Sequence, residues 1–585
     1  MICDVCLPIF QSPDWGDHHA DIASLLESAA DGCYICQPLL QYALKKSGSL
    51  ENSMAKPYTY RLYQTQPRGI IIVDMSIFQN DGKDATDEYW LLQMVPSSDI
   101  TADLGIRHGQ SAIPVSEASR VAQGCCQKNH EPVAYPRRLL EIRESTIRLV
   151  SPIEERLKAP YEAIEVLRGL SIRYLWIDAL CIIQSGQGST EDWQEESAKM
   201  QEVYSNSIIC LSLFRAAQPG ESCLAECSPH TTMPPFQVEA TGYDREEEKE
   251  EEKEEPTAYT VLSNYYYSDA LYDQPLALHA WGLQERLLPP RVFSFGLGEF
   301  FWDCTEMPNA CESFPRGLRN HIADNSPADD IIGLTDKVIP ATSDRETLES
   351  FWWRILEEYT DRSLTYPEKD KLVAFSAIST RMQTALDDTY LAGHFWRLLP
   401  ASLNWQVEPP LPSMKRREGT PRRIVQSKLD LEEVDKRREI TPSWSWASME
   451  GSLFLKPPPR IFSLADAHSI TLQAHSADVK WIEGSPVFVG EPPCDIKAYH
   501  FQVDIDDPED HPEGGATCSL LPLTEDDWLG RWEGLVLKEV VAEGGIMYER
   551  IGHFIISDPQ DMDNRPWRDD YKTVFGQEKR TMTLV

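Results

Sequence analysis

Six side chains near the N-terminus are of the types that bind metal ions. Two pairs of cysteines with C-x2-C spacing bracket two adjacent histidines, and the six residues are Cys3, Cys6, His18, His19, Cys33 and Cys36. Cysteines two residues apart can approach one ion from a single turn of chain. The spacing therefore predicts a structural, tetrahedral zinc site of four thiolates, or of three thiolates and one imidazole. The alternative is that the cysteines pack as small apolar residues in a helical core.

A second candidate site follows the apolar run YLWI at 174–177. Asp178 comes directly after this run, and Cys181 and Gln184 follow within about two helical turns. Ligands of α/β sheets bind beyond the carboxyl ends of strands, where a carboxylate can accept a proton or hold a ribose hydroxyl. The alternative is that Asp178 caps the following turn and Cys181 is a core residue. Spacing alone favours this structural alternative.

The segment HAWGLQER at 279–286 groups charged and polar side chains within about one helical turn. Gln284, Glu285 and Arg286 follow closely after Trp281. A Glu-Arg pair is more often a structural ion pair than a catalyst. We therefore expect this segment to stabilise the fold.

The segment PSWSWAS at 442–448 alternates tryptophan with small residues. In an extended segment this alternation places Trp444 and Trp446 on one side and Ser443 and Ser445 on the other. Two indoles on one side are typical of an anchor, so we expect them to attach the C-terminal domain to the rest of the chain.

The elements that must position these residues follow the order of an α/β unit. Helical spacing over 161–170 precedes the apolar run YLWI, which predicts a buried strand. Asp192 is predicted to cap the next helix, with Glu195 three residues later in the capping-box position. The run SIICLSLF at 207–214 then predicts a second core strand. Helix, strand, helix and strand in this order indicate an α/β core.

The pattern changes beyond this core, and the whole chain is predicted to be a multi-domain α+β protein. The segment 320–400 is mainly helical, 406–440 is rich in Pro, Lys and Arg, and short alternating stretches follow Trp444. The expected domains are 1–56, a small Cys/His unit; 57–135, a poorly defined connecting region; 136–320, an α/β core with a solvated acidic insertion at 244–255; 321–405, a helical region; 406–440, an exposed linker; and 441–585, a β-rich domain.

The composition excludes several classes of function. Among 585 residues, 55 Lys and Arg oppose 93 Asp and Glu, and the net charge of −38 argues against a nucleic-acid partner. The N-terminus lacks the features of a secretory signal, and no apolar run reaches the roughly 18 residues of a membrane span. We therefore expect an intracellular, cytoplasmic protein whose cysteines are thiols or metal ligands. P-loop, HExxH and GxSxG motifs are absent from the sequence.

Taken together, these blocks closely resemble the fungal heterokaryon incompatibility (HET) domain proteins. The resemblance covers roughly residues 136–451, and YERIGHF near the C-terminus and the N-terminal Cys/His arrangement are similar to segments that flank that domain. The blocks that carry it are YLWIDALCIIQ, DWQEESAKMQEVYSNS, AWGLQERLLPPRVFSFG, FWDCTE, YTDRSLTYPEKDKLVAFSAIS, GHFWRLLPASLNW and PSWSWASMEG.

The resemblance implies a role in fungal allorecognition, the distinction of self from non-self, and in programmed cell death. It also implies an α/β core related to Toll/interleukin-receptor (TIR) domains, some of which cleave nicotinamide dinucleotides while others only assemble. One expectation is a signalling or interaction module, with proteins of an incompatibility system or a second copy as partners. The other is an NAD-type glycohydrolase, a nucleosidase acting on a nucleotide substrate.

The enzyme interpretation names particular residues. Its catalytic candidates are the carboxylates of Asp178, Glu195 and Glu196. The residues expected to line its ligand pocket are Cys181, Gln184 and Trp193. The residues expected to be structural are Trp281, Gln284, Glu285, Arg286, Trp444 and Trp446.

One departure from the family pattern favours the signalling role. Family members carry a strand and loop of the form Leu-Ser-(Tyr/His)-x-Trp-Gly, with several tens of further residues, where this chain has only 151–160. In the TIR comparison that strand is the first of the sheet, and its loss leaves strand edges unpaired and the pocket incomplete. An error in gene prediction, a decayed inactive copy and a trimmed domain all fit the gap, and each one lowers the expectation of catalysis.

Overall fold

The computed structural model divides the chain into two compact units. The first comprises Met1–Leu278 and Glu285–Val338, and the second comprises His279–Gln284 and Ile339–Val585. These units are coarser than the domains expected from the sequence, whose boundaries remain predictions. The structure describes residues 2–10, 16–19, 21–47, 59–65, 70–76, 89–97, 140–142, 158–224, 236–240, 257–264, 266–297, 300–304, 344–407, 422–424, 441–455, 470–482, 484–489, 500–526, 531–542, 545–557, 574–575 and 578–585.

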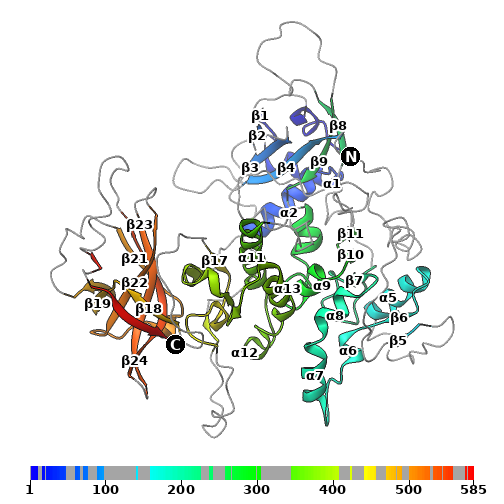
Figure 1. The fold of residues 1–585 in the computed structure, drawn as a ribbon. Helices are drawn as coiled ribbons and strands as arrows, with labels where there is room; N and C mark the ends of the chain where they lie inside the picture. Colours follow the sequence, from blue (N-terminus) through cyan, green and yellow to red (C-terminus); the bar gives the residue numbers. More distant parts are fainter. Residues whose placement is uncertain are drawn as a thin grey trace. The chain divides into compact units, whose positions relative to one another are not determined.

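A six-stranded antiparallel sheet forms the N-terminal part of the first unit (Figure 1). Three of its strands come from 57–135, where the sequence shows little periodicity, and two flank the acidic insertion, which lies outside the described residues. In spatial order the strands are β1 (Gly16–Asp17), β2 (Thr59–Thr65), β3 (Ile70–Ser76), β4 (Tyr89–Pro96), β9 (Thr257–Ser263) and β8 (Phe236–Ala240).

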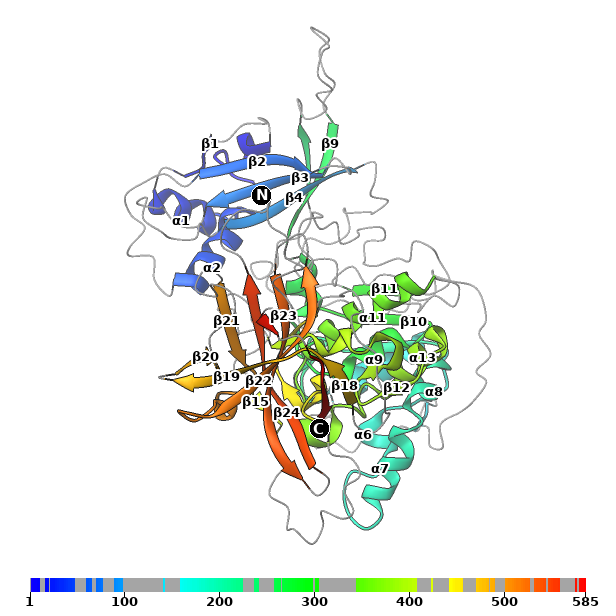
Figure 2. The ribbon, with the colours of Figure 1, turned by 60° about the vertical axis from the view of Figure 1, so that its left-hand side comes forward.

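The helices that neighbour the Cys/His residues pack on this sheet. The helices α1 (Ile22–Ala30) and α2 (Cys36–Ser47) lie beside the sheet (Figure 2). Together with the 3-10 helix η1 (Leu7–Phe10), they share one apolar core with alternate side chains of β3. Asp21 caps α1, because its carboxylate accepts a hydrogen bond of 2.8 Å from the backbone N–H of Ser24. The sheet therefore provides the rigid support on which the metal-ligand candidates are placed.

The predicted α/β core contains small, separate sheets. One has the order β11-β10-β7, with β7 parallel to β10, and the other pairs β5 with β6. The elements are β5 (Leu140–Glu141), α5 (Lys158–Gly169), β6 (Tyr174–Leu175), α6 (Asp178–Cys181), α7 (Ser189–Ser197), α8 (Met200–Ser205), β7 (Cys210–Ser212), α9 (Gly282–Leu287), β10 (Arg291–Phe295) and β11 (Phe300–Cys304).

Two predicted elements of this core are confirmed and two details are wrong. The helix over 161–170 and the strand within SIICLSLF are present as α5 and β7. YLWI is not a buried strand, because β6 has only two residues and Tyr174 is 48% exposed. Asp192 does not cap α7: the helix begins at Ser189 after Gly188, and the Asp192 carboxylate accepts the backbone N–H of Ile183 at 2.9 Å.

The second unit combines helices with a large sheet, which confirms the β-rich C-terminal domain and the mixed α+β class. The described part of the helical region contains α11 (Arg345–Thr360), α12 (Pro367–Asp370) and α13 (Ser376–Leu386). The sheet has the order β18-β25-β24-β23-β22-β19-β20, with β21 also paired to β24. Its strands are β18 (Ile470–Ala474), β19 (Ala477–Ile482), β20 (Ser485–Phe488), β21 (His500–Ile505), β22 (Thr517–Asp526), β23 (Arg531–Ala542), β24 (Gly545–Ser557) and β25 (Arg580–Leu584).

The two indoles of PSWSWAS lie on different sides of the chain, so the predicted extended segment is wrong. The segment turns into the 3-10 helix η7 (Trp446–Ser448). Trp444 packs in the apolar core of the large sheet, whereas Trp446 makes edge contacts with Tyr359 and Phe375 of the helical region, at 5.9 and 5.8 Å between ring centroids. The segment still joins sheet to helices, with one indole on each side.

None of the helices within the described ranges combines the length and the apolar character that crossing a bilayer requires.

Candidate functional site

The six metal-ligand candidates lie together in the first unit. The turn that leads into η1 carries Cys3 and Cys6, the stretch after β1 carries the two histidines, and the start of α2 with the turn before it carries Cys33 and Cys36. Both histidines are buried, at 5% and 0% exposed. The alternative of cysteines packed only as apolar residues does not account for two buried imidazoles directed at their thiols.

The distances between donor atoms are those of a ligand set. The Cys6 and Cys36 sulfurs are 3.3 Å apart. The Cys36 Sγ lies 3.1 Å from His19 Nε2 and 3.7 Å from Cys3 Sγ. One donor atom from each of these four residues lies within 4.8 Å of the other three, which makes them a candidate metal-binding cluster.

The surroundings of the imidazoles favour their role as ligands. His19 Nδ1 lies 2.8 Å from Ser24 Oγ, an outer contact that fixes the ring and leaves Nε2 directed at the thiols. Burial, with the neighbouring His19, lowers the pKa of His18 to about 3, so its ring stays neutral. A neutral imidazole keeps the lone pair that a metal ion requires. Soft thiolates with neutral imidazoles fit zinc.

The candidate carboxylates of the enzyme interpretation each have a local partner. Asp178 is exposed at the first position of α6, and its side chain accepts the backbone N–H of Ala179 at 2.7 Å. Glu195 is exposed and pairs with Lys199 at 2.7 Å. Glu196 is 2% exposed and lies 3.6 Å from the same ammonium group. These contacts are local: one lies within α6, and the two to Lys199 join α7 to the start of α8.

Two of the residues expected to line the pocket lie on these short helices, and Gln184 lies between them. Cys181 is buried at the end of α6, at 2% exposed. Gln184 is exposed, and its amide donates to the backbone carbonyls of Asp178 at 3.2 Å and Ile182 at 3.1 Å. Trp193 is partly buried on α7. The amide of Gln184 therefore holds the end of α6.

Tyr204 is the residue of this region that sequence reasoning missed. It lies on α8, contacts the Trp176 ring edge-on at 5.9 Å and hydrogen-bonds the carboxylate of Glu285. Burial, followed by the charges of Glu285, Cys210 and Asp178, raises the pKa of its phenol well above the usual value. Tyr204 thereby brings together two segments that are far apart in the sequence. The only signal for it in the sequence was its place on an apolar helix face.

The side chains of the segment HAWGLQER make contacts that hold other parts of the fold. The buried Arg286 guanidinium donates to the Tyr272 hydroxyl at 3.0 Å and lies 4.6 Å from the centre of that ring. In the second unit, the Gln284 amide donates to the backbone carbonyl of Ala374, and the Trp281 indole hydrogen-bonds the Asp370 carboxylate.

A buried polar network supports the tail segment YERIGHF on β24. Arg550 is fully buried, forms a two-pronged pair with Asp506 at 2.8 and 3.1 Å, and donates to the backbone carbonyls of Leu403 and Trp405. Its guanidinium also lies 3.2 Å from the centre of the Trp405 ring. A buried charge with this many partners serves to fix the strand against the preceding segment.

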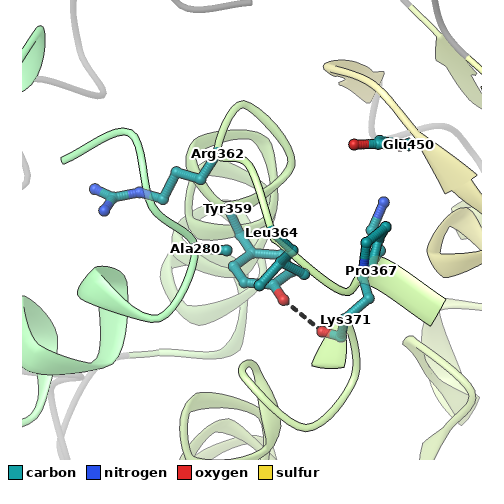
Figure 3. A pocket seen from close by; sticks show the side chains of 7 residues that line it. All are labelled: Ala280, Tyr359, Arg362, Leu364, Pro367, Lys371 and Glu450. Carbon is teal, nitrogen blue, oxygen red and sulfur yellow. Dashed lines mark hydrogen bonds between the residues drawn. The ribbon is translucent and has the colours of Figure 1, made fainter. Parts of the chain in front are cut away.

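A small pocket lies among the helices of the second unit (Figure 3). Its cavity volume of about 10 Å³ holds about one water molecule and is far below the roughly 300 Å³ at which small-molecule sites begin. Two of its lining residues are joined by a hydrogen bond, which the Tyr359 hydroxyl donates to the backbone carbonyl of Lys371 (Figure 3). Its lining consists of Ala280, Tyr359, Arg362, Leu364, Pro367, Lys371 and Glu450.

Comparison with known proteins identifies one region of the chain. The family described as "Heterokaryon incompatibility protein (HET)" matches residues 131–285. No curated protein and no solved structure matches. The matched region contains Asp178 and Tyr204 and ends at Glu285, so the cluster around Tyr204 is formed within it.

Proposed function

We propose that this chain, a HET domain-containing protein of the heterokaryon incompatibility type, acts in fungal self/non-self recognition and programmed cell death as a signalling or interaction module. The family match supports the general role. The mechanism that fits the residues of the matched region best is association with a second copy of the chain, through an apolar surface.

Exposed apolar side chains within the matched region carry this proposal. Leu180 on α6 is 45% exposed and Ile183, three residues later, is 42% exposed. Tyr174 and Ile208 are 48% and 49% exposed. Exposed apolar side chains that lie close together in the chain, as Leu180 and Ile183 do, are candidates for a protein interaction site. We call Leu180 and Ile183 the α6 apolar pair.

The local contacts of the carboxylates support association ahead of catalysis. A general acid or a transition-state stabiliser must direct its carboxyl group at the substrate. Asp178 instead contacts the backbone of α6, and Glu195 pairs with Lys199, two residues after the end of α7. One alternative is that the chain is a TIR-like NAD-type glycohydrolase. The other is that it is a decayed, inactive copy.

We also propose that the Cys/His cluster binds structural zinc. The ion would hold the turn before η1, the stretch after β1 and the start of α2 on the N-terminal sheet. Structural zinc contributes folding free energy directly, because its ligands are brought together only in the folded chain.

The association mechanism is tested by placing charges on the α6 apolar pair. We expect the wild-type chain to self-associate in light scattering after gel filtration, and to arrest growth when expressed in a fungal host. The double variant Leu180→Glu, Ile183→Glu should be monomeric and should not arrest growth, because carboxylates in an apolar contact are desolvated without a partner.

Matched controls come from the C-terminal sheet. Val541 and Ile546 are 85% and 58% exposed, so Val541→Glu with Ile546→Glu adds the same charge outside the matched region. This control should associate and arrest growth like the wild type. A wild-type chain that stays monomeric, or a double variant that still arrests growth, contradicts the mechanism. If the wild-type chain releases nicotinamide from NAD and the Asp178→Ala variant does not, the result would instead support the glycohydrolase function.

A further inference from the structure

We propose that the Cys/His cluster binds two zinc ions, bridged by the thiolates of Cys6 and Cys36. This inference rests on the proposed zinc site and concerns its stoichiometry. All six donor side chains then serve as ligands, where a single tetrahedral site would use four of them.

The arrangement of donors has two matching halves around a central pair of thiols. Cys6 and Cys36 are 3.3 Å apart. Cys36 has Cys3 Sγ at 3.7 Å and His19 Nε2 at 3.1 Å. Cys6 has Cys33 Sγ at 3.7 Å and His18 Nε2 at 2.9 Å. Each central sulfur therefore has one further thiol and one imidazole nitrogen as neighbours.

The two halves give two complete ligand sets. Two thiolates on one tetrahedral zinc, with Zn–S bonds of about 2.3 Å, lie about 3.8 Å apart. The outer Sγ–Sγ distances of 3.7 Å match this spacing. Two tetrahedral ions need eight ligand positions, and six side chains supply them only if two ligands are shared. Thiolates can be shared, whereas an imidazole nitrogen has one lone pair, so the central sulfurs are the bridges.

The charge of the site favours two ions over one. Four thiolates and two neutral imidazoles balance two divalent ions, so the complete cluster is neutral. One ion held by Cys3, Cys6, His19 and Cys36 leaves a net negative charge in a buried site. With one ion, Cys33 and His18 would lie next to the cluster but would have no ion to bind, although they are only 2% and 5% exposed.

The zinc content of the full-length protein tests the proposal. Native mass spectrometry and elemental analysis of chain purified without chelator should find two zinc ions per chain. Cys33→Ser should lower this content, because it removes a ligand of the second ion. A single site formed by the other four residues predicts one ion and no effect of Cys33→Ser. Cys518→Ser, also buried at 1% exposed but in the C-terminal sheet, is the control and should keep two ions.

Cobalt substitution gives a second measurement that needs no variant. Two Co²⁺ ions bridged by thiolates couple magnetically, so the high-spin EPR signal per cobalt should be much weaker than that of a single tetrahedral ion. One metal ion per chain with a full EPR signal overturns the two-ion proposal and leaves the zinc site in place. A folded chain that binds no metal overturns both.

Discussion

At the scale of single residues, side chains in the HET-matched region act mainly as links between segments. Tyr204 contacts Trp176 and hydrogen-bonds Glu285, which lies 81 positions further along the chain. Arg286, the next residue, is held by Tyr272. The segments by which the sequence resembles the family are therefore connected by particular polar contacts in the folded chain.

Replacing Tyr204 by phenylalanine tests this connection. Tyr204→Phe removes the hydroxyl that bonds the Glu285 carboxylate, and hydrogen bonds to charged groups contribute about 1.5–3 kcal/mol. We expect the free energy of unfolding to fall by about this amount in urea denaturation followed by tryptophan fluorescence. Tyr366→Phe is the control: its side chain is 57% exposed in the second unit, and its loss should have little effect. Equal stability of the two variants would contradict the role of Tyr204.

At the scale of elements, the HET-matched region contains short strands in separate sheets. β6 pairs with β5 and β7 pairs with β10, yet Leu175 and Leu211 contribute to one apolar cluster with α5. The expectation that a strand of the family pattern is missing after Val150 remains a prediction. The junction after Val150 itself lies outside the described residues.

The joint between η7 and the turn at Gly393 is a closely packed contact between elements of the second unit. Trp446 Nε1 donates to the Gly393 carbonyl at 2.6 Å. Gly393 has a φ of +94°, and a Cβ there would lie 2.5 Å from Trp446 Nε1. The glycine is therefore required both by backbone conformation and by the approach of the indole.

Gly393→Ala should destabilise the second unit by more than the free-energy cost of backbone strain alone. Gly515 has nearly the same φ, +93°, but a Cβ there meets only Lys480 Cε at 3.9 Å, so Gly515→Ala is a matched control. We expect Gly393→Ala to lower the free energy of unfolding by about 1–3 kcal/mol more than the control, because the indole must shift. If the two variants unfold at similar temperatures, the Trp446 contact contributes nothing to the stability of the second unit.

At the scale of the whole molecule, the dominant physical property is the charge. The net charge of −38 is spread along the chain, since Asp244–Glu255 contributes only nine acids and three bases. Such a surface repels polyanions and keeps the protein in solution, and it leaves association to local apolar contacts.

The charge predicts no retention of nucleic acid. Full-length protein should pass through a DNA column at physiological salt, because it has no excess of cations to displace counterions from phosphate. Deleting 244–255 removes part of the charge and should not create binding. Salt-sensitive retention of the intact chain on DNA would contradict this prediction and would indicate a local basic site.

Local patterns explain what could be predicted from the sequence. The grouping of the candidate metal ligands, the helix α5, the strand β7 and the β-rich C-terminal domain follow from spacing and periodicity over a few residues. The failures share a cause. Asp192 and YLWI fit local rules, but the backbone of Ile183 and the two-residue pairing with β5 decided their structure. Local rules cannot include partners that other segments supply.

By itself, the sequence determined the family resemblance, the set of candidate metal ligands and the acidic character of this protein, because each depends on residue identity and order. Only the tertiary structure decided how the six ligands divide around Cys6 and Cys36, that Tyr204 meets Glu285, and that Trp444 and Trp446 face different cores. These outcomes depend on distances between segments tens of residues apart, and such distances are fixed by the packing of the whole fold.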